Sequence, residues 1–139
     1  MNYLLDTCVI SELIKNQPER RVISWLSNIP EEYLFLSVFT IGELHKGIEK
    51  LPDSKKKSLL HNWISIDLRT RFENRIIVFD IKAAELWGSI QSKTELSGTP
   101  MSLIDGLICS IAMSNEMTLV TRNTKDMKAS GAPLLNPWN

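Results

Sequence analysis

Four acidic residues stand where short apolar runs give way to polar or helical stretches. They are Asp6 after the run 3–5, Glu43 after the run 34–38, Asp105 at the start of the apolar stretch 102–115, and Asp126 after the run 118–121. If the apolar runs are parallel strands, their carboxyl ends meet at one edge of a sheet, and the acids converge there. Converging carboxylates without matching cations need neutralising, and Mg²⁺ is the hard, oxygen-preferring ion that usually does so. A hydrated metal ion held by carboxylates can hydrolyse a phosphodiester.

These acids also have a purely structural interpretation. Thr40 with Glu43 and Ser102 with Asp105 match the capping-box spacing, in which the acid reaches back to a backbone N–H. Asp6 could in the same way cap the helix that follows it. At about 100° per residue, Glu43 and Asp105 lie about 120° from the centres of their apolar stripes, at the margin of a buried face in the first helical turn. Spacing alone leaves the capping and metal-site interpretations open.

The elements that must position these acids alternate along the chain. Apolar runs predict strands at 3–5, 34–38, 76–79 and 118–121, with a short fifth at 134–135. Helical spacing predicts helices from 6 to 14 and at 19–27, 40–51, 54–68, 81–96 and 102–115, with a turn or loop at 97–100. Strands that alternate with helices favour a parallel sheet with crossover helices, and therefore an α/β fold. No repeat or linker divides the chain, so we expect one domain over residues 1–139.

The charge balance excludes one class of partner. Lys plus Arg and Asp plus Glu both number 16, so the formal net charge is zero. That is not the basic excess of a typical duplex-DNA binder. The basic residues cluster at 20–21, at 55–57 and at Arg69, Arg71 and Arg75, apart from the four acids. This segregation permits a basic rim around an acidic pocket, although solvated helix faces are the simpler interpretation.

The chain has only two cysteines, Cys8 and Cys109, each among apolar neighbours. They are typical of small buried side chains and not of a disulfide framework or a zinc site. No apolar run approaches the roughly 20 residues of a membrane span, and no secretory signal precedes the first strand. We therefore expect a cytoplasmic protein with no membrane contact.

The sequence resembles the PIN-domain ribonucleases of the VapC/FitB toxin group. The likeness begins with Leu-Leu-Asp-Thr-Cys-Val-Ile-Ser-Glu-Leu at 4–13 and continues through 40–44 with a following Gly47. It extends through 105–108 and 121–126 and ends with Asn-Pro-Trp at 136–138. The motifs occur in order over nearly the whole chain. Two positions depart from the pattern: Cys8 stands where Asn is common, and Met127 where an aromatic residue is common.

This resemblance implies a three-layer α/β/α domain with a central, mostly parallel sheet. It also implies an endoribonuclease that depends on Mg²⁺, with Mn²⁺ as a substitute, and that cleaves single-stranded or loop RNA, including tRNA. Asp6 and Asp105 would be the main metal ligands, joined by Glu43 directly or through water, and Thr7 or Ser102 would orient the attacking water. Such toxins usually form homodimers and are inhibited by a cognate antitoxin protein.

The fourth acidic position and the substrate contacts are ambiguous. Asn123 stands where many PIN domains carry an Asp, so Asp126, three residues on, is the candidate for the missing negative charge. We expect Asp126 to act with the three other acids, because a charged oxygen is the better Mg²⁺ ligand. Thr7, Ser102, Arg122 and Asn123 are predicted to contact the substrate.

Two other functions are alternatives to the nuclease. An Asp after the first strand is also the nucleophile of dehalogenase-like phosphatases and of phospho-accepting receivers. The phosphatase pattern needs a second acid two residues on, where this chain has Cys8. A non-catalytic protein-binding module with the same fold would have no need of Asp6, Glu43 and Asp105 together.

Overall fold

A computed structural model describes all of residues 1–139 and contains a central sheet of five parallel strands. The strands are β1 (Tyr3–Leu5), β2 (Leu34–Ser37), β3 (Ile76–Ile77), β4 (Thr118–Val120) and β5 (Leu134–Leu135). Their order across the sheet is β3-β2-β1-β4-β5. The parallel α/β prediction is confirmed, although β3 is two residues shorter than the predicted strand 76–79.

The helices follow the strands as the sequence predicts, with several differences in detail. The α-helices are α1 (Thr7–Glu12), α2 (Arg20–Asn28), α3 (Val38–Glu49), α4 (Lys55–Asn62), α5 (Arg69–Arg71), α6 (Ile81–Leu96), α7 (Leu103–Ser114) and α8 (Thr124–Met127). Short 3₁₀ turns occupy η1 (Glu31–Tyr33) and η3 (Lys128–Ser130). The predicted helix 54–68 is interrupted by a π-helical stretch, η2 (Trp63–Leu68). None of these helices is both long and apolar enough to cross a membrane.

Helix α3 begins earlier than predicted, which changes the interpretation of Glu43. The hydroxyl of Ser37, and not that of Thr40, caps the helix by accepting a hydrogen bond from the Thr40 backbone N–H at 3.2 Å. The predicted capping box of Thr40 and Glu43 is therefore wrong, and Glu43 lies in the second turn of α3. The backbone N–H groups at that position are already bonded within the helix, so the Glu43 carboxylate does not serve as a cap and is available for another role.

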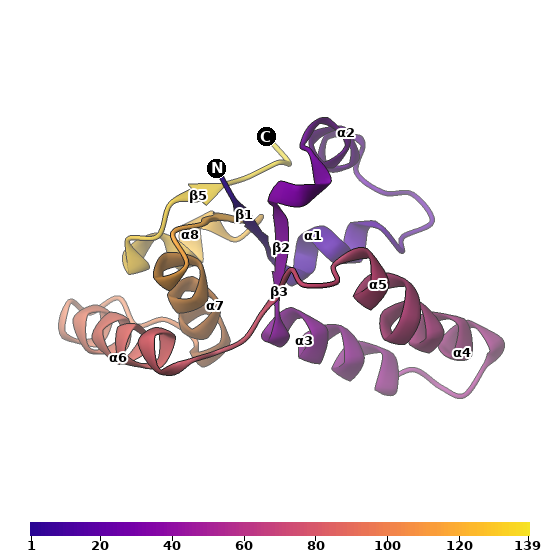
Figure 1. The fold of residues 1–139 in the computed structure, drawn as a ribbon. Helices are drawn as coiled ribbons and strands as arrows, with labels where there is room; N and C mark the ends of the chain where they lie inside the picture. Colours follow the sequence, from indigo (N-terminus) through magenta and orange to yellow (C-terminus); the bar gives the residue numbers. More distant parts are fainter.

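Two hydrophobic cores cover the two faces of the sheet, as successive strand side chains point to opposite sides. Leu5 and its neighbours on that face pack against helices α1 to α4 and η2. Leu4 and Leu119 pack on the other side against α6 and α7. Figure 1 shows α6 and α7 on one side of the strands and α1, α3, α4 and α5 on the other. The predicted three-layer α/β/α arrangement is confirmed.

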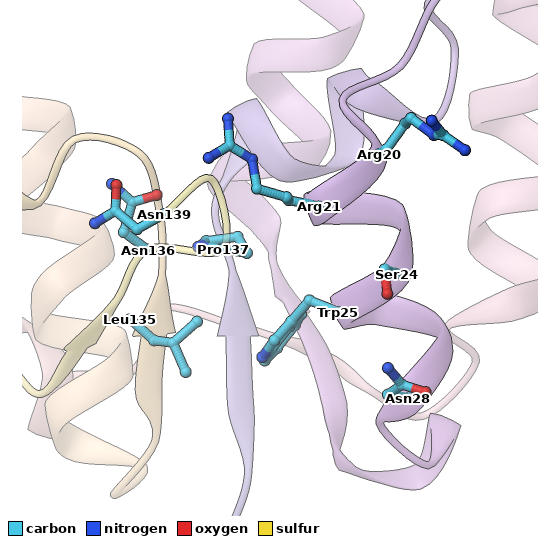
Figure 2. A pocket seen from close by; sticks show the side chains of 9 residues that line it. All are labelled: Arg20, Arg21, Ser24, Trp25, Asn28, Leu135, Asn136, Pro137 and Asn139. Atoms are coloured by element: carbon cyan, nitrogen blue, oxygen red, sulfur yellow. The ribbon is translucent and has the colours of Figure 1, made fainter.

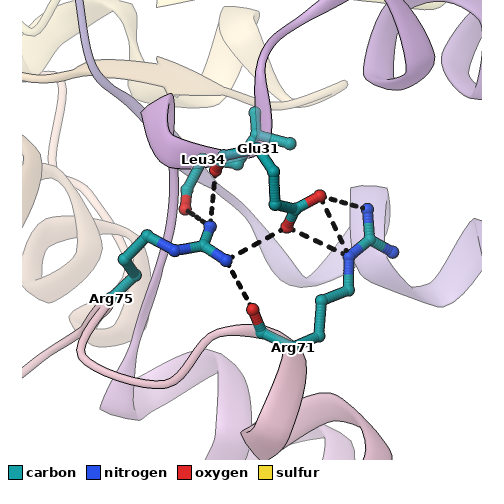
Figure 3. A network of polar contacts seen from close by, with 4 residues as sticks. All are labelled: Glu31, Leu34, Arg71 and Arg75. Atoms are coloured by element: carbon teal, nitrogen blue, oxygen red, sulfur yellow. Dashed lines mark hydrogen bonds and ion pairs between the residues drawn. The ribbon is translucent and has the colours of Figure 1, made fainter.

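An arginine–glutamate network fixes the start of β2 (Figure 3). Arg71 Nε and Arg75 Nη2 donate to Glu31 Oε2 at 3.1 and 3.2 Å, and Arg75 also donates to the Leu34 carbonyl. Burial raises the pKa of Glu31, but the hydrogen bonds and charges of Arg71 and Arg75 outweigh it, and the pKa lies below its ordinary value. The network ties η1 and β2 to the segment before β3, and so helps to place the α3 helix that follows β2.

Candidate active site

Asp6 lies at the carboxyl end of β1 and is almost fully buried, with 4% of its surface exposed. Its Oδ1 accepts a hydrogen bond from the Thr7 N–H, and its Oδ2 accepts one from the Thr121 hydroxyl, both at 2.8 Å. Leu5 pairs with Val120 across β1 and β4. Asp6 follows Leu5 and Thr121 follows Val120, so this register makes Asp6 and Thr121 direct neighbours. Asp6 thus caps α1, as the structural interpretation proposed, and still belongs to a polar cluster at the sheet edge.

The environment of Asp6 opposes its negative charge. Burial has the largest effect and raises the pKa of the Asp6 carboxyl, while the hydrogen bonds from Thr121 and Thr7 lower it in part. The charges of Glu43 and Asp105 raise the pKa further. The net direction is upward, because a buried carboxylate beside two others is destabilised by desolvation and repulsion. A bound cation would relieve both effects.

Glu43 and Asp105 reach the same cavity from two different helices. Glu43 is half-buried and accepts a hydrogen bond from the Thr7 hydroxyl. The Ser102 hydroxyl caps α7 by accepting from the Asp105 N–H at 3.3 Å, but the Asp105 carboxylate makes no return bond to Ser102. The predicted capping box is therefore only half formed, and the Asp105 carboxylate lies free in the cavity lining.

The carboxylates line a cavity of about 370 Å³ at the carboxyl ends of β1 and β4. Its lining residues are Asp6, Thr7, Cys8, Ser11, Lys15, Glu43, Ile104, Asp105, Arg122 and Asn123. The lining therefore contains three of the four predicted acids and three of the four predicted substrate contacts. We call it the carboxylate cavity.

The donor set of the carboxylate cavity fits a hard divalent cation. None of its three carboxylates forms an ion pair with a side chain of the protein. Of the cations in the lining, Lys15 pairs with Glu12 outside the acidic cluster, and the Arg122 guanidinium lies over the Trp138 ring at 4.9 Å. The available ligands are carboxylate and amide oxygens, which Mg²⁺ and Mn²⁺ prefer.

Two predicted site residues lie outside this cavity. Asp126 and Ser102 line a neighbouring cavity of about 800 Å³, which shares only Asp105 with the first. Asp126 is exposed on the short helix α8. Asn123, just before that helix, lines the carboxylate cavity itself. The arrangement thus places Asn123, and not Asp126, beside Asp6, Glu43 and Asp105.

Three lining or supporting residues were not singled out from the sequence. Thr121 is fully buried and accepts a hydrogen bond from the Asn123 N–H at 3.0 Å while it donates to Asp6. Its position directly after β4, equivalent to that of Asp6 after β1, is the signal that could have revealed it. Ser11 lies four residues after Thr7, one turn along the same side of α1, and Lys15 lies in the turn that follows the helix.

A second group of potential metal ligands is separate from the carboxylates. Ligand atoms of His45, Glu49 and His61 lie within 4.8 Å of one another, and all three side chains are exposed. At 100° per residue, His45 and Glu49 lie about 160° and 120° around α3 from Glu43. This group therefore faces away from the carboxylate cavity and does not complete its ligand set.

The sequence matches the PIN domain family over residues 3–130. Toxin FitB of Neisseria gonorrhoeae is 35% identical over 136 residues, which cover 98% of each protein. VapC ribonuclease Y4jK of Sinorhizobium fredii is 31% identical over 97% of this chain and 96% of its own length. The crystal structure of FitAcB from Neisseria gonorrhoeae superimposes with a TM-score of 0.94 at 35% identity, covering 99% of both chains.

An α/β/α fold with acids gathered at the carboxyl ends of parallel strands, together with these matches, defines the class: the chain belongs to the PIN domain family. Within that family its relatives are the VapC/FitB toxins, and its structural neighbours are VapBC and FitAB toxin–antitoxin complexes.

Proposed function

We propose that this chain is the toxin of a type II toxin–antitoxin pair and an endoribonuclease that depends on Mg²⁺, with Mn²⁺ as a substitute. Its substrate is single-stranded or loop RNA, including the loops of tRNA. One observation carries the proposal: Asp6, Glu43 and Asp105 line one cavity and have no cationic partner in the protein. The names of the VapC relatives support the choice of RNA as the substrate.

Each residue of the carboxylate cavity has a role in this proposal. Asp6 and Asp105 hold the metal ion, and Glu43 joins them directly or through water. When bound, the ion supplies Lewis acidity, which makes water a better nucleophile near neutral pH and polarises the phosphoryl group. The Thr7 hydroxyl donates a hydrogen bond to Glu43 and so restrains the orientation of that carboxylate. By holding Glu43 in place, Thr7 would help to orient the attacking water, since in-line attack depends on position as much as on charge.

The substrate contacts come from the loop after β4. Arg122 is exposed at the cavity rim and can bind a phosphate, because its guanidinium makes paired hydrogen bonds to phosphate oxygens. Asn123 offers an amide oxygen at the position where a fourth acid was expected. Ser102 and Asp126 line the adjacent cavity, where they would contact RNA that extends past the scissile bond.

Two surfaces support the proposed partners. A groove of about 420 Å³ shares Thr7, Ser11, Lys15 and Glu43 with the carboxylate cavity, and its other lining residues are largely apolar ones from α3, α4 and the turns that follow α1 and α3. An apolar antitoxin segment in this groove would end beside the carboxylates and block them. For a homodimer, Val78 and Ile81 are 62% and 78% exposed near the Phe39–Phe79 ring pair. We place the protein in the cytoplasm as a single domain, residues 1–139.

RNA cleavage by the purified, antitoxin-free chain tests the proposal. Cleavage should vanish in EDTA and return with Mg²⁺ or Mn²⁺, and expression of the chain alone should arrest growth. Asp105→Asn keeps the shape of the side chain but removes its charge, so it should abolish both effects without loss of folding, while Asp67→Asn on the exposed surface of η2 is the matched control. Undiminished cleavage in chelator, or full toxicity of Asp105→Asn at equal protein level, would refute the metal role.

A further inference from the structure

A fourth cavity, of about 800 Å³, lies between α2 and the C-terminal segment (Figure 2). Its lining residues are Arg20, Arg21, Ser24, Trp25, Asn28, Leu135, Asn136, Pro137 and Asn139. The lining contains two arginines and no Asp or Glu side chain. Figure 2 shows Arg21 and Asn139 facing each other across the hollow, with Trp25 below them. We call this cavity the α2 groove.

The chemistry of the α2 groove suits an anionic chain with planar groups. Arg20 is exposed and forms no ion pair. Arg21 pairs with Glu19 through Nε at 2.8 Å, but its side chain is 64% exposed, so the pair is weak and the outer guanidinium nitrogens remain available. Ser24 and Asn28 add neutral donors. Arginine, hydroxyl and amide donors are the groups that contact the sugar–phosphate backbone of nucleic acids.

Trp25 adds a rigid aromatic surface to these donors. Its ring packs edge-on against Tyr3 of β1, with ring centroids 5.1 Å apart, which fixes its orientation. It remains only half-buried and lines the open groove. A fixed aromatic ring beside basic side chains is the combination with which proteins bind single-stranded nucleic acid, because every base has a face that can stack.

The α2 groove is connected to the carboxylate cavity through two residues. Arg122 lines the carboxylate cavity and its guanidinium lies 4.9 Å from the centre of the Trp138 ring. Trp138 stands between Pro137 and Asn139 in the chain, and both of these line the α2 groove. Arg122 thus lies between the carboxylates and the chain segment that lines the α2 groove, and a strand that leaves the carboxylates past Arg122 would run toward the groove.

We propose that the α2 groove binds the substrate RNA on one side of the cleavage point, with its backbone phosphates on Arg20 and Arg21 and a base on Trp25. The inference rests on the proposed ribonuclease function and extends it, because it specifies a strand longer than the carboxylate cavity alone can hold. It also assigns a role to the basic pair 20–21, which is remote from the acids in sequence.

The test compares two single-stranded RNAs, one that only spans the carboxylate cavity and one that extends beyond it at both ends. Binding is measured by fluorescence anisotropy in EDTA, where no cleavage occurs, and cleavage separately with Mg²⁺. The double variant Arg20→Ala, Arg21→Ala should weaken binding of the long RNA by about tenfold or more and raise its KM with kcat unchanged. Arg69→Ala, an exposed arginine on α5 outside the groove, is the matched control and should behave as wild type.

Salt dependence gives a second readout. Each phosphate contact with a single strand contributes roughly 0.7 to the slope of log affinity against log salt, so loss of two contacts should reduce the slope by about 1.4. The short RNA should show neither change. Trp25→Leu, which keeps apolar volume but removes the aromatic face, should weaken binding of the long RNA without changing the salt slope.

The outcomes are distinct. Equal affinity of wild type and the double variant for the long RNA would overturn the groove assignment, even if cleavage by the carboxylates is intact. Unchanged RNA binding with weakened inhibition by the antitoxin would overturn it too and would make the groove a protein-docking surface. A wild-type protein that cleaves neither RNA with Mg²⁺ would instead refute the proposed function. The anisotropy measurement is made without Mg²⁺, so it tests the groove independently of cleavage.

Discussion

Replacement of Thr121 by Val would test whether the buried hydroxyl at the end of β4 organises the carboxylate cavity. The side chain is fully buried, and its Oγ1 donates to Asp6 at 2.8 Å and accepts from the Asn123 N–H at 3.0 Å. Val has nearly the same volume but can make neither bond. The substitution therefore removes one orienting contact from each of two cavity residues without opening a void.

The expected cost follows from the two lost bonds. A hydrogen bond to a charged group contributes about 1.5–3 kcal/mol and a neutral one about 1 kcal/mol, so Thr121→Val should lower the free energy of unfolding by about 2.5–4 kcal/mol. For a domain of this length that corresponds to a fall in Tm of about 10 °C. Loss of the Thr121 bond also removes an influence that lowers the pKa of Asp6, so this pKa should rise further. Loss of such a supporting bond typically weakens metal affinity by about 10–100-fold.

Urea denaturation of the metal-free protein and calorimetric titration with Mn²⁺ measure these two effects. Thr121→Ser retains the hydroxyl and is the matched control; it should bind Mn²⁺ nearly as wild type does. A Thr121→Val protein with wild-type stability and wild-type Mn²⁺ affinity would refute the view that this hydroxyl positions Asp6. A loss of stability with unchanged affinity would show that the contact serves folding only.

Three further predictions concern the fourth position of the carboxylate cavity, its metal ion and the Glu31 network. Asn123→Ala should reduce RNA cleavage more than Asp126→Ala, because only Asn123 lines the carboxylate cavity; the reverse order in a cleavage assay would return the fourth position to Asp126. Mn²⁺ at 100 times its Kd should stabilise wild type by about 2.7 kcal/mol in thermal unfolding but leave an Asp6→Asn, Asp105→Asn double variant unchanged, and equal stabilisation would place the metal elsewhere. Glu31→Gln should cost about 1 kcal/mol at pH 7. Since the folded-state pKa of Glu31 lies below its ordinary value of 4.5, that cost should fade as the pH falls through the lowered pKa, and a pH-independent cost in urea denaturation would contradict the ion-pair explanation.

The sequence by itself determined the fold class and located the three acids that line the carboxylate cavity. Apolar runs and helical spacing are local signals, and they located the five strands and the principal helices to within a few residues. Parallel strands bring their carboxyl ends to one edge, so the position of Asp6 directly after β1 already predicted where it would lie. The same local pattern located Glu43 and Asp105, and the resemblance to PIN domains favoured a metal-binding role over the capping role that spacing alone left open.

The tertiary structure decided what local patterns cannot encode. The different surroundings of Asn123 and Asp126 depend on the path of the chain after β4, where Thr121 holds the Asn123 N–H and α8 carries Asp126 toward another cavity. Whether Ser102 and Asp105 close a capping box was likewise a matter of side-chain orientation, which spacing does not set. In both cases residues that are close in the sequence have different surroundings. The surroundings are set by helices and strands that are distant in the sequence but adjacent in the fold.

The register between β1 and β4 made the largest difference. It pairs Leu5 with Val120 and so places Thr121 beside Asp6 across 115 positions of sequence. The α2 groove likewise forms only where a helix near the N-terminus meets the last residues of the chain. Strand pairing and helix packing are long-range contacts stabilised by burial of apolar surface. A single sequence therefore reveals the strands and helices but not which of them pack against each other.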